Sequence, residues 1–346
     1  MSAALRDLGS MMMLGIRGAT PGDPRLEEDL DACAHAGVRM VILFDHDLYN
    51  GGDRNVRSPA QVRALTDHVR SRLGADALVA IDQEGGRVQR LSPAHGFAGW
   101  PSAREFASLA AEEQFSQSRA MAVALRNVGI TLNFAPCVDV NIDPESPVIG
   151  AMKRSFSGDP ETVSACANRV VQSHREVGVA CVLKHFPGHG SASVDSHHDL
   201  VDISQTWERE RELVPYRALI GKNLGVMTGH LMLAQFDIDR PASLSPAVTT
   251  RLLRDEYGFA GPIFTDALDM EGVRARWSLE ETICLGLEAG ADVIVHACNS
   301  ARGEYAPEVV KAMEQVCSKI DGLTVRAGLA RERVRLLIHA KNAETS

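Results

Sequence analysis

The chain alternates short apolar runs with longer segments in which apolar residues recur at helical spacing. Each apolar run spans six to eight residues, and its apolar positions follow one another instead of alternating with polar ones. That pattern is typical of strands buried on both faces, as in a parallel sheet covered by helices. The eight runs are 11–16, 38–44, 77–82, 131–138, 179–185, 225–230, 261–266 and 291–297.

The segments between the runs carry apolar residues at i, i+3 and i+4, which predicts amphipathic helices. Several begin with Ser, Thr or Asp before Pro or Glu, the residues that start helices. Several end on glycine, at Gly37, Gly74, Gly129 and Gly178. The clearest helical segments are 24–37, 58–74, 111–129, 159–178 and 207–223.

Eight strands that alternate with helices predict an α/β fold, a single (β/α)₈ TIM-type barrel with its site at the C-terminal ends of the strands. A doubly wound open sheet is the alternative, but no GxGxxG motif follows any of the runs. No linker or low-complexity tract divides the chain. We therefore expect residues 1–346 to form one barrel domain, with a final packing helix near 323–343.

Composition narrows the class of protein. Hydrophobic residues make up 45% of the 346, and the net charge of −9 comes without a Lys/Arg stripe, so nucleic acid is not an expected partner. The seven cysteines form no CxxC pair, which favours buried thiols in a reducing compartment. The N-terminus lacks a signal-peptide pattern, and no window is apolar over eighteen residues. We expect a cytoplasmic monomer that does not bind membranes.

Charged residues follow most of the predicted strands. Such residues are rare at the ends of buried strands unless they are paired or functional. In a (β/α)₈ barrel these ends form the mouth in which the active site is built, so the charged residues predict a binding or catalytic site there. The residues at these positions are Asp45, Asp82, Asp139, Lys184 with His185, His230, Asp266 and His296.

Two kinds of chemistry fit these side chains. The segment KHFPGHGSASVDSHHDL contains His185, His189, His197 and His198, which could ligate zinc, but no helical i, i+4 histidine pair is present and nearby Lys and Arg would compete with a cation. Glycosyl transfer instead needs a nucleophilic carboxylate, a proton donor and fixed hydrogen-bonding groups for the sugar hydroxyls. Asp266, at the tip of an apolar strand, suits the nucleophile.

Five motifs occur in order along the chain: IDQEGGRVQR, NFAPCVDVN, VIG followed by RSF, KHFPGHG followed by DSH, and FTDALDMEGV. Together they resemble the family 3 glycoside hydrolases, and within that family the single-domain β-N-acetylglucosaminidases (β-hexosaminidases) of bacterial cell-wall recycling. The resemblance extends from about residue 10 to about residue 300.

The resemblance implies a role for each matching position. Asp266 falls on the nucleophile that forms a covalent glycosyl-enzyme, His197 on the general acid/base and Asp195 on the partner of that histidine. His230 and Met270 also fall near this region. The positions that fall on sugar-binding residues are Asp82, Arg90, Arg154, Lys184 and His185. The resemblance implies no cofactor and no metal.

Some residues of these motifs have a purely structural interpretation. We expect His189 to shape the Pro-Gly turn after the fifth run, and Glu84 to pair with Arg87 or Arg90. Asp269 and Glu271 are interpreted as helix-capping residues.

The chain departs from the family pattern at two places. The stretch VIGAMKRSF is two residues longer than the usual VIG-x-RSF, so Arg154 can be displaced and Lys153 could replace it. Gly229 stands before His230 where relatives often have alanine. Neither departure changes the assignment of the catalytic residues.

We therefore expect a retaining exo-β-N-acetylglucosaminidase that removes terminal GlcNAc from peptidoglycan fragments or chitooligosaccharides. A β-N-acetylglucosaminide phosphorylase on the same scaffold is the main alternative, because both reactions pass through a glycosyl-enzyme. A β-glucosidase is a weaker alternative, since those relatives usually take a carboxylate acid/base from a second domain. A barrel that binds sugar without turnover is a further alternative.

Overall fold

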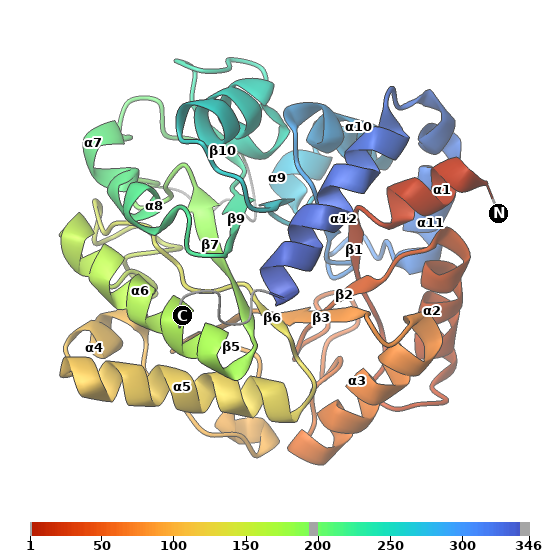
Figure 1. The fold of residues 1–346 in the computed structure, drawn as a ribbon, viewed down its shortest axis with the longest axis horizontal. Coiled ribbons are helices and arrows are strands. Elements are labelled where there is room, and N and C mark those ends of the chain that lie inside the picture. The colour runs from red at the N-terminus through yellow and green to blue at the C-terminus, as the bar shows by residue number, and fades with distance from the viewer. Residues whose placement is uncertain (1, 194–199, 340–346) are drawn as a thin grey trace.

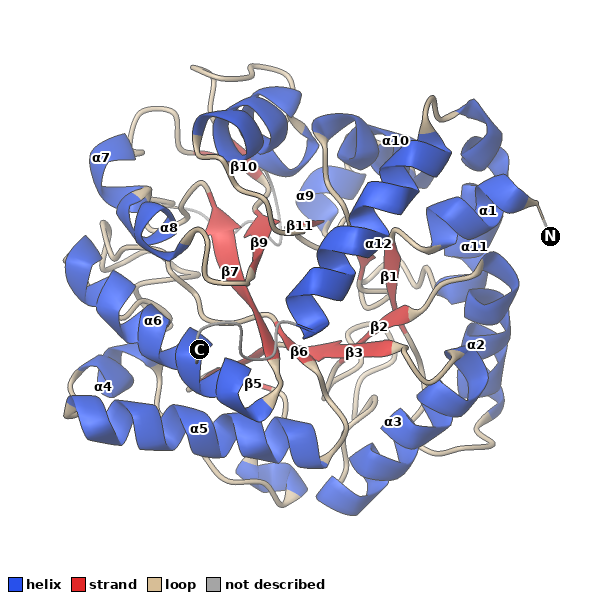
Figure 2. Ribbon diagram, viewed as in Figure 1, coloured by secondary structure: helices blue, strands red, loops and turns tan. Residues whose placement is uncertain are grey.

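The computed structural model describes residues 2–193 and 200–339. Within them, eight parallel strands form a ring that is surrounded by helices (Figures 1 and 2). Each predicted apolar run coincides with one strand, although most strands are shorter than their runs. The strands are β1 (Met12–Gly15), β2 (Met40–Leu43), β3 (Leu78–Ile81), β6 (Leu132–Asn133), β7 (Ala180–Phe186), β9 (Gly225–Thr228), β11 (Ile263–Thr265) and β12 (Ile294–His296).

The order of the strands around the sheet is β11, β9, β7, β6, β3, β2, β1, β12, with all neighbours parallel. A parallel bridge between Phe264 and Val293 joins β11 to β12 and closes the ring. The predicted (β/α)₈ barrel is therefore confirmed. Two short pairs lie outside the ring: β4 (Gln83–Gly85) with β5 (Val88–Gln89), and β8 (Val201–Asp202) with β10 (Leu231–Met232).

Helices follow the strands, and their ends match the sequence signals. Asp159 caps the helix that starts at Pro160, and Gly178 ends it in the left-handed conformation with φ 81°. The α-helices are α1 (Ala3–Gly9), α2 (Pro24–Ala36), α3 (Pro59–Leu73), α4 (Ala103–Ala107), α5 (Ala111–Asn127), α6 (Pro160–Val177), α7 (Arg209–Glu212), α8 (Val214–Leu219), α9 (Glu271–Arg274), α10 (Leu279–Ala289), α11 (Ala306–Val316) and α12 (Leu323–His339). Shorter or wider turns are η1 (Pro93–His95), η2 (Ala242–Leu244), η3 (Ala247–Glu256, a π-helix) and η4 (Cys317–Lys319).

One predicted helix is divided. The segment 207–223 forms α7 and α8, which meet at Leu213. Pro215 lies in the first turn of α8, where its missing N–H is tolerated, but in one continuous helix it would remove a hydrogen bond. The break places Glu212, the last residue of α7, in the buried layer beside the barrel.

The core has an inner and an outer layer. Met13, Ile42, Val182 and Phe264 belong to the cluster inside the ring, whereas their neighbours in sequence pack between the strands and the helices. Helix α12 lies across the ring in Figure 1, and its Leu337 joins the inner cluster. The Arg333 guanidinium on α12 contacts Asp292 at 2.6 Å, just before β12. This helix therefore covers the N-terminal end of the barrel.

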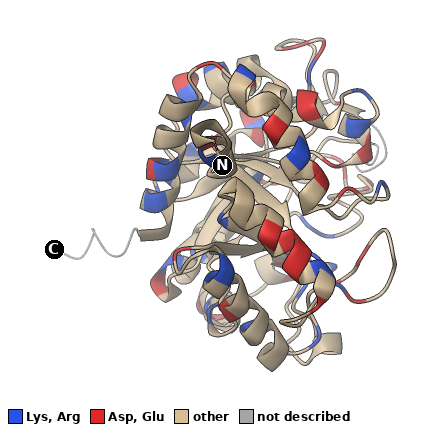
Figure 3. Cartoon of the chain, turned by 90° about the vertical axis from the view of Figure 1, so that its right-hand side faces the viewer, with Lys and Arg blue, Asp and Glu red and all other residues tan. Residues whose placement is uncertain are grey.

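Charged residues of both signs are distributed over the outer helices (Figure 3). None of the described helices is both long and apolar enough to cross a membrane.

Candidate active site

The hairpin of β4 and β5 extends from the C-terminal end of β3 and carries acidic and basic side chains toward β7. Lys184, near the end of β7, lies 2.6 Å from Asp82 Oδ1 and 2.7 Å from Glu84 Oε1. Arg154 donates two hydrogen bonds to the Glu84 carboxylate, from Nε at 2.9 Å and from Nη2 at 2.7 Å. The structure thus brings together two cations and two carboxylates from three parts of the chain.

Three of these four side chains are nearly buried, and for Glu84 and Lys184 the neighbouring charges oppose the effect of burial on the pKa. Burial alone would raise the pKa of Glu84, but Arg154 and Lys184 hold it well below its usual range. Burial would lower the pKa of Lys184, and Asp82 and Glu84 raise it instead. Lys184 and Glu84 are 3% and 5% exposed, whereas Asp82 is 16% exposed, so Asp82 is the carboxylate that reaches the opening.

The interpretation of Glu84 from sequence was wrong. Glu84 pairs with Arg154 and Lys184, not with Arg87 or Arg90. It lies two residues after Asp82 on an extended segment, and this spacing was a usable signal because it places both side chains on the same face. The partners lie 70 and 100 positions further along the chain, which only the tertiary structure reveals.

His185 is fixed by a second buried carboxylate. Its Nδ1 lies 2.7 Å from Asp139 Oδ2, and its backbone N–H donates to Asp139 Oδ1 at 3.1 Å. The other ring nitrogen, Nε2, lies 3.4 Å from Arg154 Nη2. Burial would raise the pKa of Asp139, but His185 and His189 hold it well below its usual range. Asp139 therefore orients the imidazole as an ionised acceptor.

Arg90 is held more loosely than Arg154. Its guanidinium lies 3.4 Å from Asp45 and 3.8 Å from Asp82, and it stacks over the Phe44 ring at 5.6 Å. Its side chain is 28% exposed, and its Nε has no hydrogen-bond partner among the described residues. Arg90 is thus partly exposed and only loosely paired, although this Nε is itself buried.

Asp266 directly follows β11, at the same end of the barrel. Its Oδ1 accepts a hydrogen bond from the N–H of Ala267 at 2.8 Å. Burial would raise its pKa, but His230, His185 and the Ala267 N–H lower it to about 2. The carboxylate is therefore ionised near neutral pH, as a nucleophile must be. His230 itself is oriented by Ser243, 2.7 Å from Nδ1, and by the Ala267 carbonyl, 2.9 Å from Nε2.

Two sequence expectations concern the segment 150–154. Arg154 enters the buried network, whereas Lys153 has a φ of 59° and lies 3.3 Å from the exposed Glu105. The two-residue extension is therefore accommodated as a turn, and Lys153 does not replace Arg154.

Other expectations were wrong or fall outside the described part. His296 belongs to β12 beside Val295, whose side chain lies in the inner cluster, so His296 faces the outer layer and not the mouth. Asp269 accepts hydrogen bonds from the N–H groups of Ala297 and Asn299, and Glu271 pairs with Arg302, so neither residue caps a helix. Asp195 and His197 lie in 194–199, outside the described residues, as does His198.

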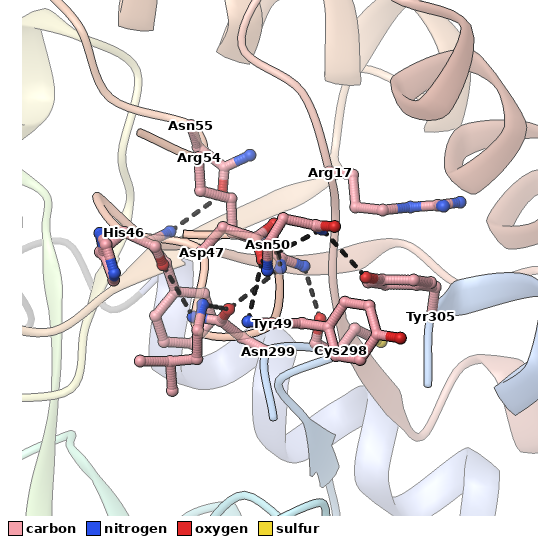
Figure 4. A network of polar contacts seen from close by, with 12 residues as sticks. Arg17, His46, Asp47, Tyr49, Asn50, Arg54, Asn55, Cys298, Asn299 and Tyr305 are labelled. Carbon is pink, nitrogen blue, oxygen red and sulfur yellow. Dashed lines mark hydrogen bonds and ion pairs between the residues drawn. The ribbon is translucent and has the colours of Figure 1, made fainter. Parts of the chain in front are cut away.

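A second buried polar network holds the loop that follows β2 (Figure 4). Arg54 donates to the carbonyls of Ile16 and Cys298 and to the side chains of Asp47 and Asn299, at 2.6–3.3 Å. The loop tip exposes Leu48 and Tyr49. Sequence reasoning assigned no role to this loop, and the network ties it to the segments that follow β1 and β12.

Among the described residues, Cys137, Asp139 and His185 bring three metal-type donors within 4.8 Å of one another. Each donor is engaged within the group: the Cys137 thiol donates to Asp139 Oδ2 at 3.2 Å, and His185 Nδ1 lies 2.7 Å from the same oxygen. Arg154 beside His185 would repel a cation. We therefore interpret the group as a hydrogen-bonded chain.

The chain was compared with known families and structures. The model of the glycosyl hydrolase family 3 N-terminal domain matches residues 13–327. A beta-hexosaminidase of Methylococcus capsulatus is 37% identical over 299 residues, which cover 84% of each chain. The beta-hexosaminidase LpqI of Mycobacterium tuberculosis is 41% identical over 246 residues, which cover 68% of this chain and 61% of LpqI.

The chain is also similar to solved structures. The family 3 beta-N-acetylglucosaminidase of Paenibacillus matches with a TM-score of 0.84 and 30% identity, over 100% of this chain and 64% of that longer one. The beta-N-acetylhexosaminidase of Beutenbergia cavernae matches with a TM-score of 0.83 and 29% identity, over 97% of this chain and 98% of the other. With a family model over most of its length and relatives of this identity, the chain belongs to glycosyl hydrolase family 3.

Proposed function

We propose that the protein is a retaining exo-β-N-acetylglucosaminidase in which Asp266 is the nucleophile. The observation that carries this proposal is an ionised carboxylate at the end of β11, at the same barrel end as two fixed cations, an oriented imidazole and further carboxylates. The names of the relatives support the class of reaction and the sugar. Terminal GlcNAc of peptidoglycan fragments or chitooligosaccharides is the substrate we infer.

In the first step, Asp266 attacks the anomeric carbon and the glycosidic bond breaks. The leaving oxygen takes a proton from His197, which Asp195 supports, and a glycosyl ester forms on Asp266. In the second step, His197 takes a proton from water, the water oxygen attacks the same carbon, and Asp266 leaves as a carboxylate. Because the enzyme supplies its own nucleophile, the N-acetyl group is not required for attack.

The sugar-binding roles follow from the state of each side chain. Asp82 and Arg90 are partly exposed and can exchange their long mutual contact for hydroxyl groups of the sugar. Lys184 and Arg154 are held by Asp82 and Glu84, so they present donors in fixed directions, and Asp139 fixes the orientation of the His185 ring. Such a preorganised set favours one orientation of one sugar ring.

A mechanism-based label tests the nucleophile directly. A 5-fluoro-GlcNAc donor should inactivate the enzyme and leave its label on Asp266, as read by peptide mass spectrometry. Full inactivation with Asp266 unlabelled would contradict the proposal.

The substrate and the acceptor can be tested in one assay. We expect turnover of 4-nitrophenyl β-GlcNAc, much less of the β-glucoside, and no dependence on phosphate. A rate that requires phosphate and releases sugar 1-phosphate would select a phosphorylase, which the hydrolase names of the relatives do not favour. The cytoplasmic location and the monomeric state stay predictions.

A further inference from the structure

The turn after β7 is clamped on two sides. A Cβ added to Gly188 would collide with the Glu212 carboxyl, and one added to Gly190 would collide with the Val140 carbonyl. The Gly190 N–H donates to Glu212 Oε2 at 3.0 Å. The Trp207 indole N–H donates to the Pro187 carbonyl at 3.1 Å. The turn that directly follows His185 therefore has little freedom to move.

Two buried carboxyl groups hold this turn through successive backbone N–H groups. Asp139 accepts from the N–H of His185 and of His189, at 3.1 and 2.8 Å, and Glu212 accepts from Gly190. Both side chains are 0% exposed. The first carboxyl also orients the imidazole of His185, whereas the function proposed above gives Glu212 no part.

The two carboxyl groups differ in what surrounds them. In the described part of the chain, the groups that face Glu212 are the Ser191 hydroxyl and Gly190 N–H of the turn, the Glu208 N–H, Asp139 after β6, and Tyr216 of α8. His189 and Cys137 lie beside Asp139 and Tyr216. The pKa of the His189 imidazole is lowered to about 4, mainly by burial, so it carries no charge at neutral pH.

Within 2–193 and 200–339, no cation pairs with Glu212. The arginines of its own helix, Arg209 and Arg211, pair with Glu256 and Glu208. Among the described residues, none donates to Glu212 Oε1. An ionised Glu212 would therefore be an unpaired buried charge next to the ionised Asp139.

We propose that Glu212 is a positioning residue that holds the turn after β7, and with it His185 and Asp139, as a neutral carboxylic acid. In this form one oxygen of Glu212 accepts a hydrogen bond from the Gly190 N–H, and Glu212 adds no second negative charge beside Asp139. Loss of the proton to solvent places a second negative charge beside Asp139 and loosens the turn. Burial, the largest cause, raises the pKa of Glu212 to about 8, so this loss falls at mildly alkaline pH.

Three variants test the proposal. Their kinetic comparison rests on the hydrolysis proposed above. Glu212→Gln keeps the acceptor and the shape of the neutral acid, and Glu212→Ala removes the acceptor. Glu210→Gln is the matched control, because Glu210 lies on the same helix with its side chain 80% exposed.

We expect Glu212→Ala to lower kcat/KM at least about tenfold at pH 6–7, and Glu212→Gln to restore most of it. From pH 7 to pH 9 the ratio of kcat/KM of Glu212→Gln to that of the wild type should rise about tenfold, because the side chain at position 212 titrates only in the wild type. The Glu210→Gln ratio should stay flat. A flat Glu212→Gln ratio, or wild-type activity of Glu212→Ala at every pH, would overturn the proposal.

The pH dependence of Tm tests the same proposal without any substrate. Because the pKa of Glu212 is higher in the folded state than in the unfolded state, its protonation stabilises the fold fully below the unfolded pKa, near 4.5. This stabilisation is lost as the pH rises toward about 8. The wild-type Tm should therefore fall between pH 5 and pH 8.5 more than that of Glu212→Gln. Parallel curves would overturn the role of Glu212, whereas turnover without Asp266 would overturn the proposed mechanism alone.

Discussion

Two buried polar networks lie at the same end of this barrel and differ in what their cations contact. On the side of β3 and β7, the cations Lys184 and Arg154 mainly meet the carboxylates of Asp82 and Glu84, at 2.6–2.9 Å. On the side of β1, β2 and β12, the cation Arg54 meets backbone carbonyls, one amide and a single carboxylate, Asp47 (Figure 4). The first network brings several charged side chains together, whereas in the second network one cation connects loops.

The difference teaches that burial of an ion pair does not by itself indicate a catalytic site. Arg54 is as buried as Lys184, with side chains 1% and 3% exposed. The Lys184 network continues to partly exposed charged groups, Asp82 and Arg90, that can exchange partners for a ligand, whereas the Arg54 network continues to the exposed neutral amide of Asn50. We therefore expect substitutions in the first network to affect turnover and those in the second to affect stability.

The largest effect should come from Asp266→Asn, which removes the carboxylate proposed as the nucleophile and keeps the shape of the side chain. We expect kcat to fall at least about a thousandfold. The fold should persist, since Asn can still accept from the Ala267 N–H. Steady-state kinetics with circular dichroism as the control check this. Turnover within tenfold of the wild type would show that another group attacks the sugar.

The next effect should come from Lys184→Met, which leaves Asp82 and Glu84 with fewer opposing charges. We expect kcat/KM to fall about a hundredfold or more, because the sugar loses a fixed donor and meets a more negative surface. The free energy of unfolding should also fall by about 3 kcal/mol, the usual cost of breaking a buried pair. Retention of kcat/KM within threefold would make the two networks equivalent.

Arg54→Met is the matching substitution in the second network. We expect the free energy of unfolding to fall by about 3–5 kcal/mol, since Asp47 loses its cation and the carbonyls of Cys298 and Ile16 each lose one hydrogen bond. The kcat/KM of the folded protein should stay within about threefold. Chemical denaturation and kinetics at low temperature separate the two effects. A loss of activity as large as that of Lys184→Met would place the β2 loop in the catalytic site.

The sequence was informative wherever a residue's role depends on its own strand. Continuous apolar runs predicted the strands because strands of this barrel are buried on both faces, and the barrel rule then placed Asp82, Lys184 and Asp266 at one end. Strand alternation would also have turned His296 away from the mouth, because Val295 faces inward.

Roles that depend on partners distant in the chain could not be predicted in this way. Asp139 and His185 lie 46 positions apart, and Arg154 and Glu84 lie 70 apart. Glu212 was part of a predicted helix, and only the break at Leu213 and the packing against Gly188 and Gly190 reveal its contact with the turn. Neither spacing nor periodicity carries that information.

The smallest effect should come from Lys153→Met, which completes the series of cation-to-methionine substitutions. Lys153 is 52% exposed and pairs with the exposed Glu105, so its removal should change the free energy of unfolding by less than about 0.5 kcal/mol. The kcat/KM should stay within about twofold, although the next residue, Arg154, lies in the buried network. Because Met replaces a cation in each of the three variants, differences in their kcat/KM reflect where the cation lies and not which residue replaces it. A tenfold loss in Lys153→Met would mean that the extended turn, and not the Glu84 network, sets the position of Arg154.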